Sequence, residues 1–206
     1  LNRCSTISGS SGSAGSKKNP DLYRSLLEAG MHHLDEYLIA NDTFDLDESE
    51  MDGRQLCLRG LHRAGRGMVD ESIGDLTRAL EHMPDLGTIY YNRAVLFEKK
   101  GDMDAAIADY DEAIRLDHDD AKAYCNRGLI RAERDMLEEA LEDFEKAVSL
   151  APSDFHSVCN RGNVYTALGR HEEAIDDFTK AIMLKPGEAY LYCNRGVSYY
   201  QLGRKD

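Results

Sequence analysis

Apolar residues in the last third of the chain recur with the spacing of an amphipathic helix. They lie at offsets of one, four, seven and eight residues, which places them on one stripe of a helix with 3.6 residues per turn. The stripe consists of Ala174, Ile175, Phe178, Ala181 and Ile182. Pro186 follows, and proline cannot continue a helix interior. The pattern therefore predicts a helix that ends shortly before residue 186.

A second helix is predicted just before this one, with Val158, Gly162 and Tyr165 on one face and a break at Leu168-Gly169. The resulting hairpin recurs with a fixed period of 34 residues, marked by the similar segments 57–60, 91–94, 125–128, 159–162 and 193–196. A fixed period of this length is typical of stacked repeats. The predicted units are 53–86, 87–120, 121–154 and 155–188, with a partial unit at 189–206.

Small residues recur at two positions of the unit, where we expect helices to cross closely. The two sets are Gly60, Ala94, Gly128, Gly162 and Gly196, and Ala79, Ala113, Ala147 and Ala181. Gly67, Gly101, Gly169 and Gly203 occupy the turn, where Asp135 is the exception. Glycine, and at modest cost aspartate, can adopt the left-handed conformation that ends a helix. One hairpin cannot bury its apolar stripe alone, so we predict an all-α, right-handed solenoid of stacked antiparallel hairpins.

These units resemble tetratricopeptide repeats. The matching residues of the third unit are Tyr124, Gly128, Ala140, Phe144, Ala147 and Pro152. The resemblance covers residues 53–206, although Arg63 and Ser72 depart from it in the first unit and His118 replaces the closing proline of the second. It implies a superhelix that holds a protein or peptide. RNA-binding pentatricopeptide repeats are disfavoured by the period and by the charge.

The formal charge of −13 argues against nucleic acid as a partner, because phosphate binding depends on Lys and Arg. A neutral or basic protein partner is easier to accommodate, although the acidity could equally serve solubility. No apolar run approaches the roughly 18 residues that a membrane span needs. We therefore expect a soluble protein, and its start at Leu1 suggests a piece of a longer one.

Four of the five cysteines, Cys57, Cys125, Cys159 and Cys193, recur at multiples of 34 residues. Their spacing thus belongs to the repeat and not to a disulfide framework or a zinc cluster. Unpaired thiols indicate a reducing compartment, so we predict a cytoplasmic location.

The flanks are expected to differ from the repeats. Residues 1–20 are Ser/Gly-rich and predicted to be disordered, as a natural linker or a cloning scar. Residues 21–52 are predicted to contain one amphipathic helix, or a degenerate hairpin, and an acidic connector that could instead compete with basic ligands. At the other end, Val197 and Tyr199 would lose part of their cover. Either the native protein continues or another chain packs there, and continuation is the simpler account.

No pattern typical of an enzyme is found. The sequence has no Gly-rich phosphate loop, no His-Glu-x-x-His pair and no Cys-x-x-Cys pair. The adjacent His32 and His33 would face about 100° apart on a helix, which makes them a poor metal site. We therefore predict no catalytic residues, no metal and no cofactor.

An arginine recurs at one position of every unit, as Arg59, Arg93, Arg127, Arg161 and Arg195. It could form an anion-binding ridge. However, an aspartate follows sixteen residues later in each complete unit, as Asp75, Asp109, Asp143 and Asp177. Antiparallel helices bring such positions together, so we favour a repeated structural ion pair worth roughly 0.5–1 kcal/mol if partly exposed.

The asparagines Asn92, Asn126, Asn160 and Asn194 precede these arginines. Asparagine is a mediocre helix former, and its amide offers both a donor and an acceptor. Peptide-binding tetratricopeptide arrays, including those of O-linked N-acetylglucosamine transferases, use asparagine at this position. The resemblance thus implies a solvent-facing ladder that pairs with an extended peptide backbone. A consensus residue kept for solvation or local bonding is the alternative.

Four such hydrogen bonds would give only about 4 kcal/mol, which the cost of association offsets. Neighbours on the predicted inner face would supply the remaining affinity and the selectivity. Within the predicted peptide groove they are Tyr91, Lys122, Leu129, His156, Asn163 and Tyr190, and Val95, Val197 and Tyr200 are expected beside them.

Some family members clamp the C-terminal carboxylate of heat-shock chaperones. In the best window only Asn92 and Lys122 match that clamp, whereas Cys57, Leu61 and Asn126 replace its Lys, Asn and Arg. A chaperone clamp is therefore not expected. The predicted function is an interaction scaffold. The substrate-recruiting or regulatory arm of a larger enzyme, such as a glycosyltransferase, and a structural spacer in a multiprotein assembly are the alternatives.

Overall fold

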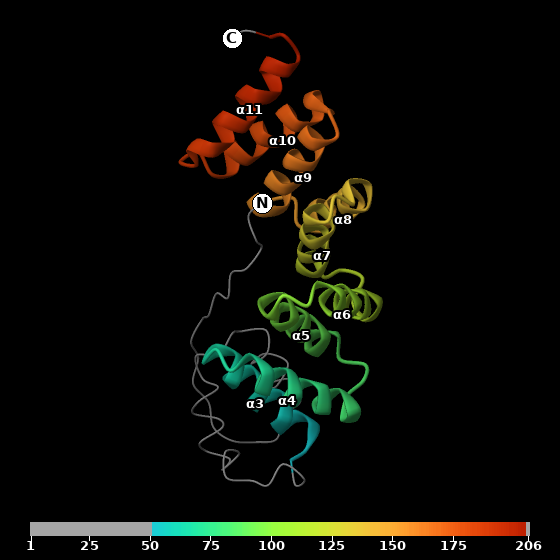
Figure 1. The fold of residues 1–206 in the computed structure, drawn as a ribbon. Coiled ribbons are helices and arrows are strands. Elements are labelled where there is room, and N and C mark those ends of the chain that lie inside the picture. The colour runs from blue at the N-terminus through green and yellow to red at the C-terminus, as the bar shows by residue number, and fades with distance from the viewer. Residues whose placement is uncertain (1–50, 205–206) are drawn as a thin grey trace. The chain divides into compact units, whose positions relative to one another are not determined.

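The computed structural model describes residues 51–204, all of whose regular elements are helices (Figure 1). Each hairpin pairs two antiparallel helices, and the first helices of successive hairpins begin at residues 53, 87, 121, 155 and 189. The hairpins are α3 (Gly53–Gly65) with α4 (Val69–His82), α5 (Gly87–Lys100) with α6 (Met103–Leu116), α7 (Ala121–Glu133) with α8 (Leu137–Leu150), and α9 (Phe155–Ala167) with α10 (His171–Leu184). A last helix, α11 (Ala189–Gln201), follows. The predicted segment 1–20, and residues 21–50 of the predicted segment 21–52, lie outside the described residues.

Acidic side chains fix the starts of several first helices. Asp52 accepts hydrogen bonds from the backbone of Arg54 and Gln55, and the Gln55 side chain accepts one from the Asp52 backbone. Asp120 and Asp154 cap α7 and α9 in a similar way. Such caps satisfy the free N–H groups of a first turn and each contribute about 1 kcal/mol.

The turn inside each hairpin has the backbone conformation that its sequence predicts. The four turn glycines have φ between 71° and 88°, and Asp135 takes the same left-handed conformation with φ 61°. In each turn, the N–H of the residue after this position donates to a carbonyl five residues earlier, for example from Arg170 to Tyr165 over 2.8 Å. This bond closes the last turn of the first helix. The expectation for the glycines and for Asp135 is confirmed.

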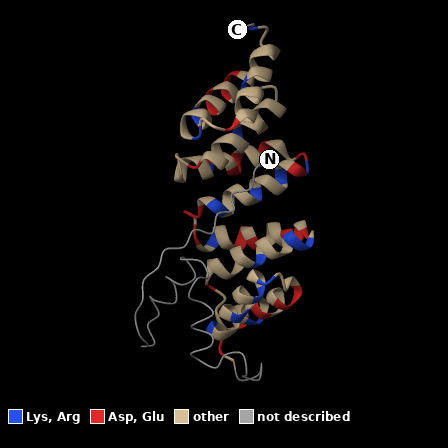
Figure 2. Cartoon of the chain, turned by 90° about the vertical axis from the view of Figure 1, so that its left-hand side faces the viewer, with Lys and Arg blue, Asp and Glu red and all other residues tan. Residues whose placement is uncertain are grey.

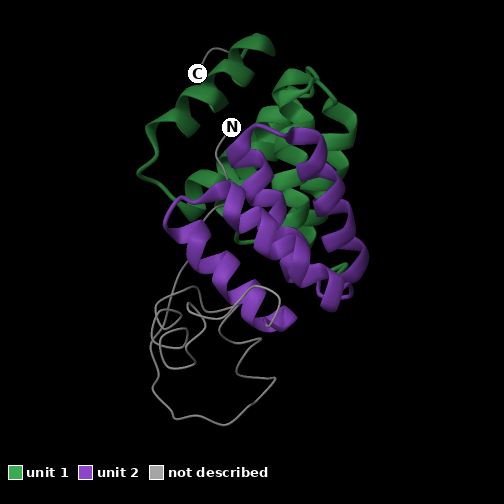
Figure 3. Cartoon of the chain, turned by 60° about the horizontal axis from the view of Figure 1, so that its bottom comes forward, with its two compact units in different colours: residues 1–4, 117–206 green, residues 5–116 purple. Residues whose placement is uncertain are grey.

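The described residues form two compact units, 51–116 and 117–204 (Figure 3). In the first unit, the apolar faces of α3, α4 and α5 bury Leu56, Leu76 and Ile89 together. In the second, α7 to α11 bury a larger cluster around Phe144, Phe178 and Leu191. In both units the apolar stripe of one hairpin is covered by the helix that follows it. A single hairpin could not bury this apolar surface alone, so the hairpins stack.

The predicted close crossings are present inside the complete hairpins. A Cβ atom added at Gly128 would lie 3.2 Å from the ring of Phe144, and one at Gly162 would lie 3.1 Å from the ring of Phe178. The first helix therefore approaches the second closely enough that only hydrogen fits between them. At Gly196 of α11 an added Cβ would meet nothing within 4 Å. One face of α11 is thus open where the same face of α7 and α9 is covered.

The helices of residues 51–204 are all too short or too polar to cross a membrane.

Candidate binding surface

The repeated arginine and aspartate form a two-pronged ion pair in every complete hairpin. In each, the arginine Nε and Nη2 atoms donate to the two carboxylate oxygens of the aspartate sixteen residues later. In the fourth hairpin these distances are 2.8 and 2.7 Å between Arg161 and Asp177. The hydrogen bond and charge of Asp177 raise the pKa of the Arg161 guanidinium despite its partial burial. The structural ion pair is confirmed in preference to an anion-binding ridge.

The aspartates of these pairs are more buried than the sequence suggested. The side chains of Asp75 and Asp143 are each 3% exposed. Arg63 and Arg131 donate a further hydrogen bond of 2.8 Å to these same carboxylates. Removing one partner of a buried pair leaves the other charge uncompensated, so the expected contribution of roughly 0.5–1 kcal/mol is too small for these positions.

The predicted solvent-facing asparagine ladder is wrong for two of its members. Asn126 is only 6% exposed and Asn160 is fully buried. Asn92 is half-buried, and its Nδ2 atom donates to the Thr88 carbonyl one turn back in the same helix, over 2.7 Å. The burial of Asn126 and Asn160 favours a structural role for these amides, because buried amides need partners. The local-bonding alternative holds for Asn92.

Asn194 takes part in a polar cluster between α9 and α11. Its Nδ2 atom donates to the Oδ1 atom of Asn163 over 3.0 Å. Asn163 in turn lies 4.0 Å from the Cys159 sulfur. Burial raises the pKa of the Cys159 thiol, and a hydrogen bond with Tyr190 opposes this only in part. The structure thus brings together three predicted groove residues, Asn163, Tyr190 and Asn194, on two neighbouring helices.

The remaining predicted groove residues differ in exposure. Lys122 is exposed, Leu129 is buried, and Tyr91 and His156 are half-buried. The rings of Tyr91 and His156 pack edge-on against Tyr110 and Phe155, respectively. Leu129 therefore belongs to the core of its unit, which corrects its placement on an open surface. Tyr91 belongs to the unit 51–116, whereas the cluster on α9 and α11 belongs to the unit 117–204.

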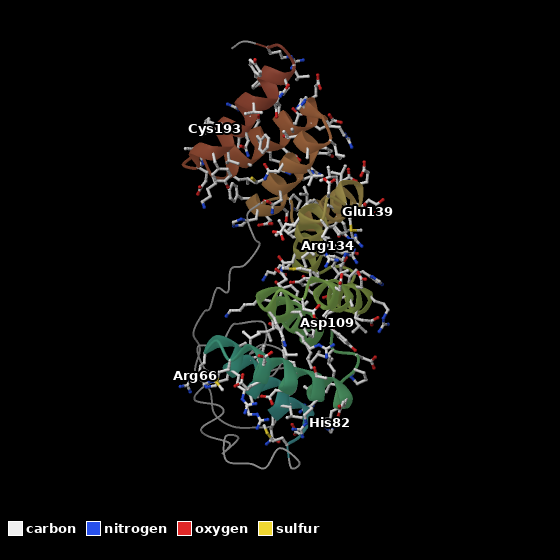
Figure 4. All side chains as sticks on the ribbon, viewed as in Figure 1. Arg66, His82, Asp109, Arg134, Glu139 and Cys193 are labelled. Atoms are coloured by element: carbon white, nitrogen blue, oxygen red, sulfur yellow. The ribbon has the colours of Figure 1, made fainter. Side chains whose placement is uncertain are left out.

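The most exposed apolar side chains of α11 lie beside the polar cluster. Tyr200 is 75% exposed and Val197 is 50% exposed. Residues three and four apart are neighbours on a helix, so Cys193, Asn194, Val197 and Tyr200 form one continuous strip. Figure 4 labels Cys193 on α11, and its side chain is exposed. We refer to Asn163, Cys193, Asn194, Val197 and Tyr200 as the α9–α11 strip.

The sequence interpretation missed Tyr192, which is 44% exposed. It is the counterpart of Tyr124 in the repeat register, where a complete hairpin half-buries the ring. The repeat register could have indicated this exposure, because Tyr192 occupies the position of Tyr124 but no described helix follows α11 to cover it.

Three of the repeat cysteines, Cys57, Cys159 and Cys193, are not disulfide-bonded, so no disulfide joins two of the repeat cysteines. Cys125 is disulfide-bonded, and there the expectation of an unpaired thiol is wrong. Within residues 51–204, no group of His, Cys, Asp and Glu side chains is arranged to hold a metal ion. Acidic and basic residues are interspersed along the helices (Figure 2).

Stacked hairpins with a 34-residue repeat, closed by an aspartate–arginine pair, define an α-solenoid repeat protein. A family model described as "TPR repeat" matches residues 97–135 and 162–203, and one described as "Tetratricopeptide repeat" matches residues 121–154. Residues 97–154 and 162–203 therefore consist of tetratricopeptide repeats, as the resemblance in the sequence predicts. No curated protein matches the chain as a whole closely enough to count as a relative.

Solved structures show the same fold. The chain superposes on the MamA protein with a TM-score of 0.67 and 24% identity, over 70% of this chain and 79% of that one. MamA from Desulfovibrio magneticus RS-1 gives 0.69 and 20%, over 74% and 86% of the two chains. YrrB, described as "a TPR protein with an unusual peptide-binding site", gives 0.71 and 18%, over 86% and 87%.

Proposed function

We propose that the chain is a protein-interaction scaffold, and that the α9–α11 strip binds an extended segment of a partner protein. The exposure of Val197 and Tyr200 beside the Asn163–Asn194 hydrogen bond carries this proposal. Exposed aromatic and aliphatic side chains next to fixed amides are the composition of a peptide contact, because apolar groups supply affinity and amides orient the backbone.

The pairing of Asn194 with Asn163 defines which groups the peptide would meet. Asn194 uses one amide hydrogen on Asn163, which leaves its carbonyl oxygen and a second hydrogen for a ligand. A single amide contributes only about 1 kcal/mol. The apolar part of the strip would therefore set the affinity, and tyrosine is among the residue types that most often dominate binding energy.

The partner is proposed to be neutral or basic, because the chain has a formal charge of −13. Long-range attraction of this kind raises association rates and weakens as salt is added. Because the strip itself is uncharged, salt should change the association rate more than it changes the dissociation rate.

The proposal is tested by selecting peptides from a phage library of random sequences on the parent chain. The selected peptides are then measured against Val197→Ser/Tyr200→Ala and against Met183→Ser. Met183 is 80% exposed on α10 and is not part of the strip, so it provides a matched loss of exposed apolar surface. We expect peptides that bind the parent and Met183→Ser but bind the double variant at least tenfold more weakly. Equal binding to all three proteins would refute the strip as the site.

A further inference from the structure

Asn163 is a polar residue at a position that is apolar in the other units. Its counterparts in the repeat register are Leu61, Val95, Leu129 and Val197. Both ends of its amide have partners. The Nδ2 atom donates to the Cys159 sulfur over 4.0 Å, and the Oδ1 atom accepts from the Asn194 Nδ2 atom over 3.0 Å. Cys159, Asn163 and Asn194 therefore form a chain of hydrogen bonds that runs in one direction, from α11 to the sulfur on α9.

The Cys159 sulfur accepts from two donors. Cys159 and Asn163 lie one turn apart on α9, so their side chains are neighbours. Tyr190 on α11 bonds to the same sulfur. Burial raises the pKa of the Cys159 thiol, and the hydrogen bonds from Tyr190 and Asn163 oppose this rise only in part. The fully buried Cys159 is therefore a neutral thiol, whose sulfur is a weak acceptor for the Asn163 amide and the Tyr190 hydroxyl.

The direction of this chain decides which atoms of Asn194 remain for a ligand. Because the sulfur accepts, Asn163 turns its Nδ2 group toward α9 and presents its oxygen to α11. Asn194 then directs its own Nδ2 group to that oxygen, and its Oδ1 atom accepts no hydrogen bond from the described residues. Asn194 is half-buried, and Val197 beside it is exposed. An oriented amide acceptor thus lies next to the apolar part of the strip.

We infer that Cys159 is a positioning residue of the α9–α11 strip, and that the strip requires a backbone N–H in the segment it binds. This role rests on the proposed function. Acting through Asn163, the sulfur holds the Asn194 Oδ1 atom ready to accept from that N–H. An acceptor that is already held loses less conformational freedom on binding. Proline has no backbone N–H, so segments with proline opposite Asn194 are rejected.

The first measurement needs no ligand. NMR of the 15N-labelled chain records hydrogen exchange of the Asn163 and Asn194 side-chain amides in the parent, in Cys159→Ala and in Cys159→Ser. We expect both amides to exchange about fivefold faster in Cys159→Ala, and to recover in Cys159→Ser, whose oxygen accepts in place of sulfur. Asn92 is the internal reference, because its amide bonds to Thr88 within α5. Unchanged exchange in Cys159→Ala overturns the positioning role, whether or not a peptide binds.

The second measurement uses peptides from the phage selection. A backbone ester replaces one N–H of the peptide at a time by oxygen. We expect one such ester to weaken binding to the parent about fivefold to tenfold, and binding to Asn194→Ala less than about twofold. Cys159→Ala should weaken the unmodified peptide about fivefold, and Cys159→Ser should restore it. Cys57→Ala is the control, because it removes a buried thiol at the same register position in the unit 51–116.

Three results of the second measurement overturn the inference. Ester effects that are equal for the parent and for Asn194→Ala show that the Asn194 oxygen meets no N–H. A loss in Cys159→Ala that Cys159→Ser does not restore, or one that Cys57→Ala shares, assigns the sulfur to packing alone. Circular dichroism verifies that each variant keeps the parent's helix content. A selection without strip-binding peptides refutes the proposed function and the N–H requirement, whereas the amide exchange still decides whether Cys159 positions Asn163 and Asn194.

Discussion

Arg127 and Asp143 join α7 to α8 through two parallel hydrogen bonds of 3.0 and 2.5 Å. Arg131 donates a third hydrogen bond of 2.8 Å to the same carboxylate. Asp143 is therefore the shared acceptor of two guanidinium groups in a nearly water-free position, with a side-chain exposure of 3%. This one carboxylate therefore links α7 to α8 through two arginines.

Replacing Asp143 with Asn should lower the free energy of unfolding by about 3–5 kcal/mol, since it removes a buried negative charge that two arginines share. Urea denaturation followed by circular dichroism measures the change. Glu112→Gln is the comparison, because its pair with Arg115 is exposed and should contribute little. Similar losses in both variants would show that the buried pair has no special weight.

The glycines at the helix crossing should differ sharply in their tolerance of a methyl group. Gly162→Ala should destabilise by about 1–3 kcal/mol, because the new Cβ would press on the ring of Phe178. Gly196→Ala should be neutral or stabilise by up to about 1 kcal/mol, because alanine favours the helix and the site is empty. Thermal unfolding of both variants measures this difference. A loss at Gly196 as large as that at Gly162 would contradict an open face.

Asn160→Ala should destabilise the chain by about 1–3 kcal/mol. The side chain is fully buried, so its loss leaves neighbouring polar groups without a partner. The effect of Asn92→Ala should be smaller, because Asn92 is half-buried and bonds only within its own helix. Chemical denaturation measures the difference: the denaturant concentrations at half-unfolding are compared between the two variants, provided that their m-values are equal. If Asn160→Ala unfolded like the parent, the asparagine would be a surface residue, as the sequence alone suggested.

The contribution of the Asp120 cap, at the start of α7, to the stability of the chain should depend on pH. Burial raises the pKa of the Asp120 carboxyl, and hydrogen bonds from the backbone of Ala123 and Lys122 offset this only in part. A folded pKa above the unfolded one stabilises the native state below the unfolded pKa, and this stabilisation is lost as the pH rises through the folded pKa. Asparagine caps a helix equally well and does not titrate.

Asp120→Asn should therefore gain stability relative to the parent as the pH rises from about 3 to 7. Denaturation at a series of pH values measures the gap, which is the difference in free energy of unfolding between Asp120→Asn and the parent. Asp119→Asn, at the exposed neighbouring position, controls for the loss of one negative charge. A gap that stays constant with pH would contradict the proposed cost of ionising Asp120.

The sequence was sufficient to predict the repeated helices and the contacts and turns formed by residues close together in the chain. The period placed every described helix, and the spacing of sixteen residues predicted the Arg161–Asp177 contact, because a tight turn leaves antiparallel helices few possible registers. The left-handed conformation of Asp135 followed from its alignment with glycines. These features depend on short stretches of chain whose geometry is nearly fixed.

The candidate site was less predictable, since periodicity assigns a residue to a face of a helix and does not state what lies against that face. Asn160 and Asn194 occupy the same register position, yet the first is fully buried and the second is half-buried beside exposed apolar groups. Leu129 and Val197 differ in the same way. Their neighbours in space, and not their place in the repeat, decide which of them can meet a ligand.

Each aspartate–arginine bridge begins and ends within one hairpin, and only a neutral threonine hydroxyl links Arg93 or Arg195 to the hairpin before it. A duplicated segment of 34 codons would therefore encode the counter-ion of its own repeat arginine. Such an array can gain or lose copies during evolution without a compensating mutation at this ion pair, so its length can change by whole repeats.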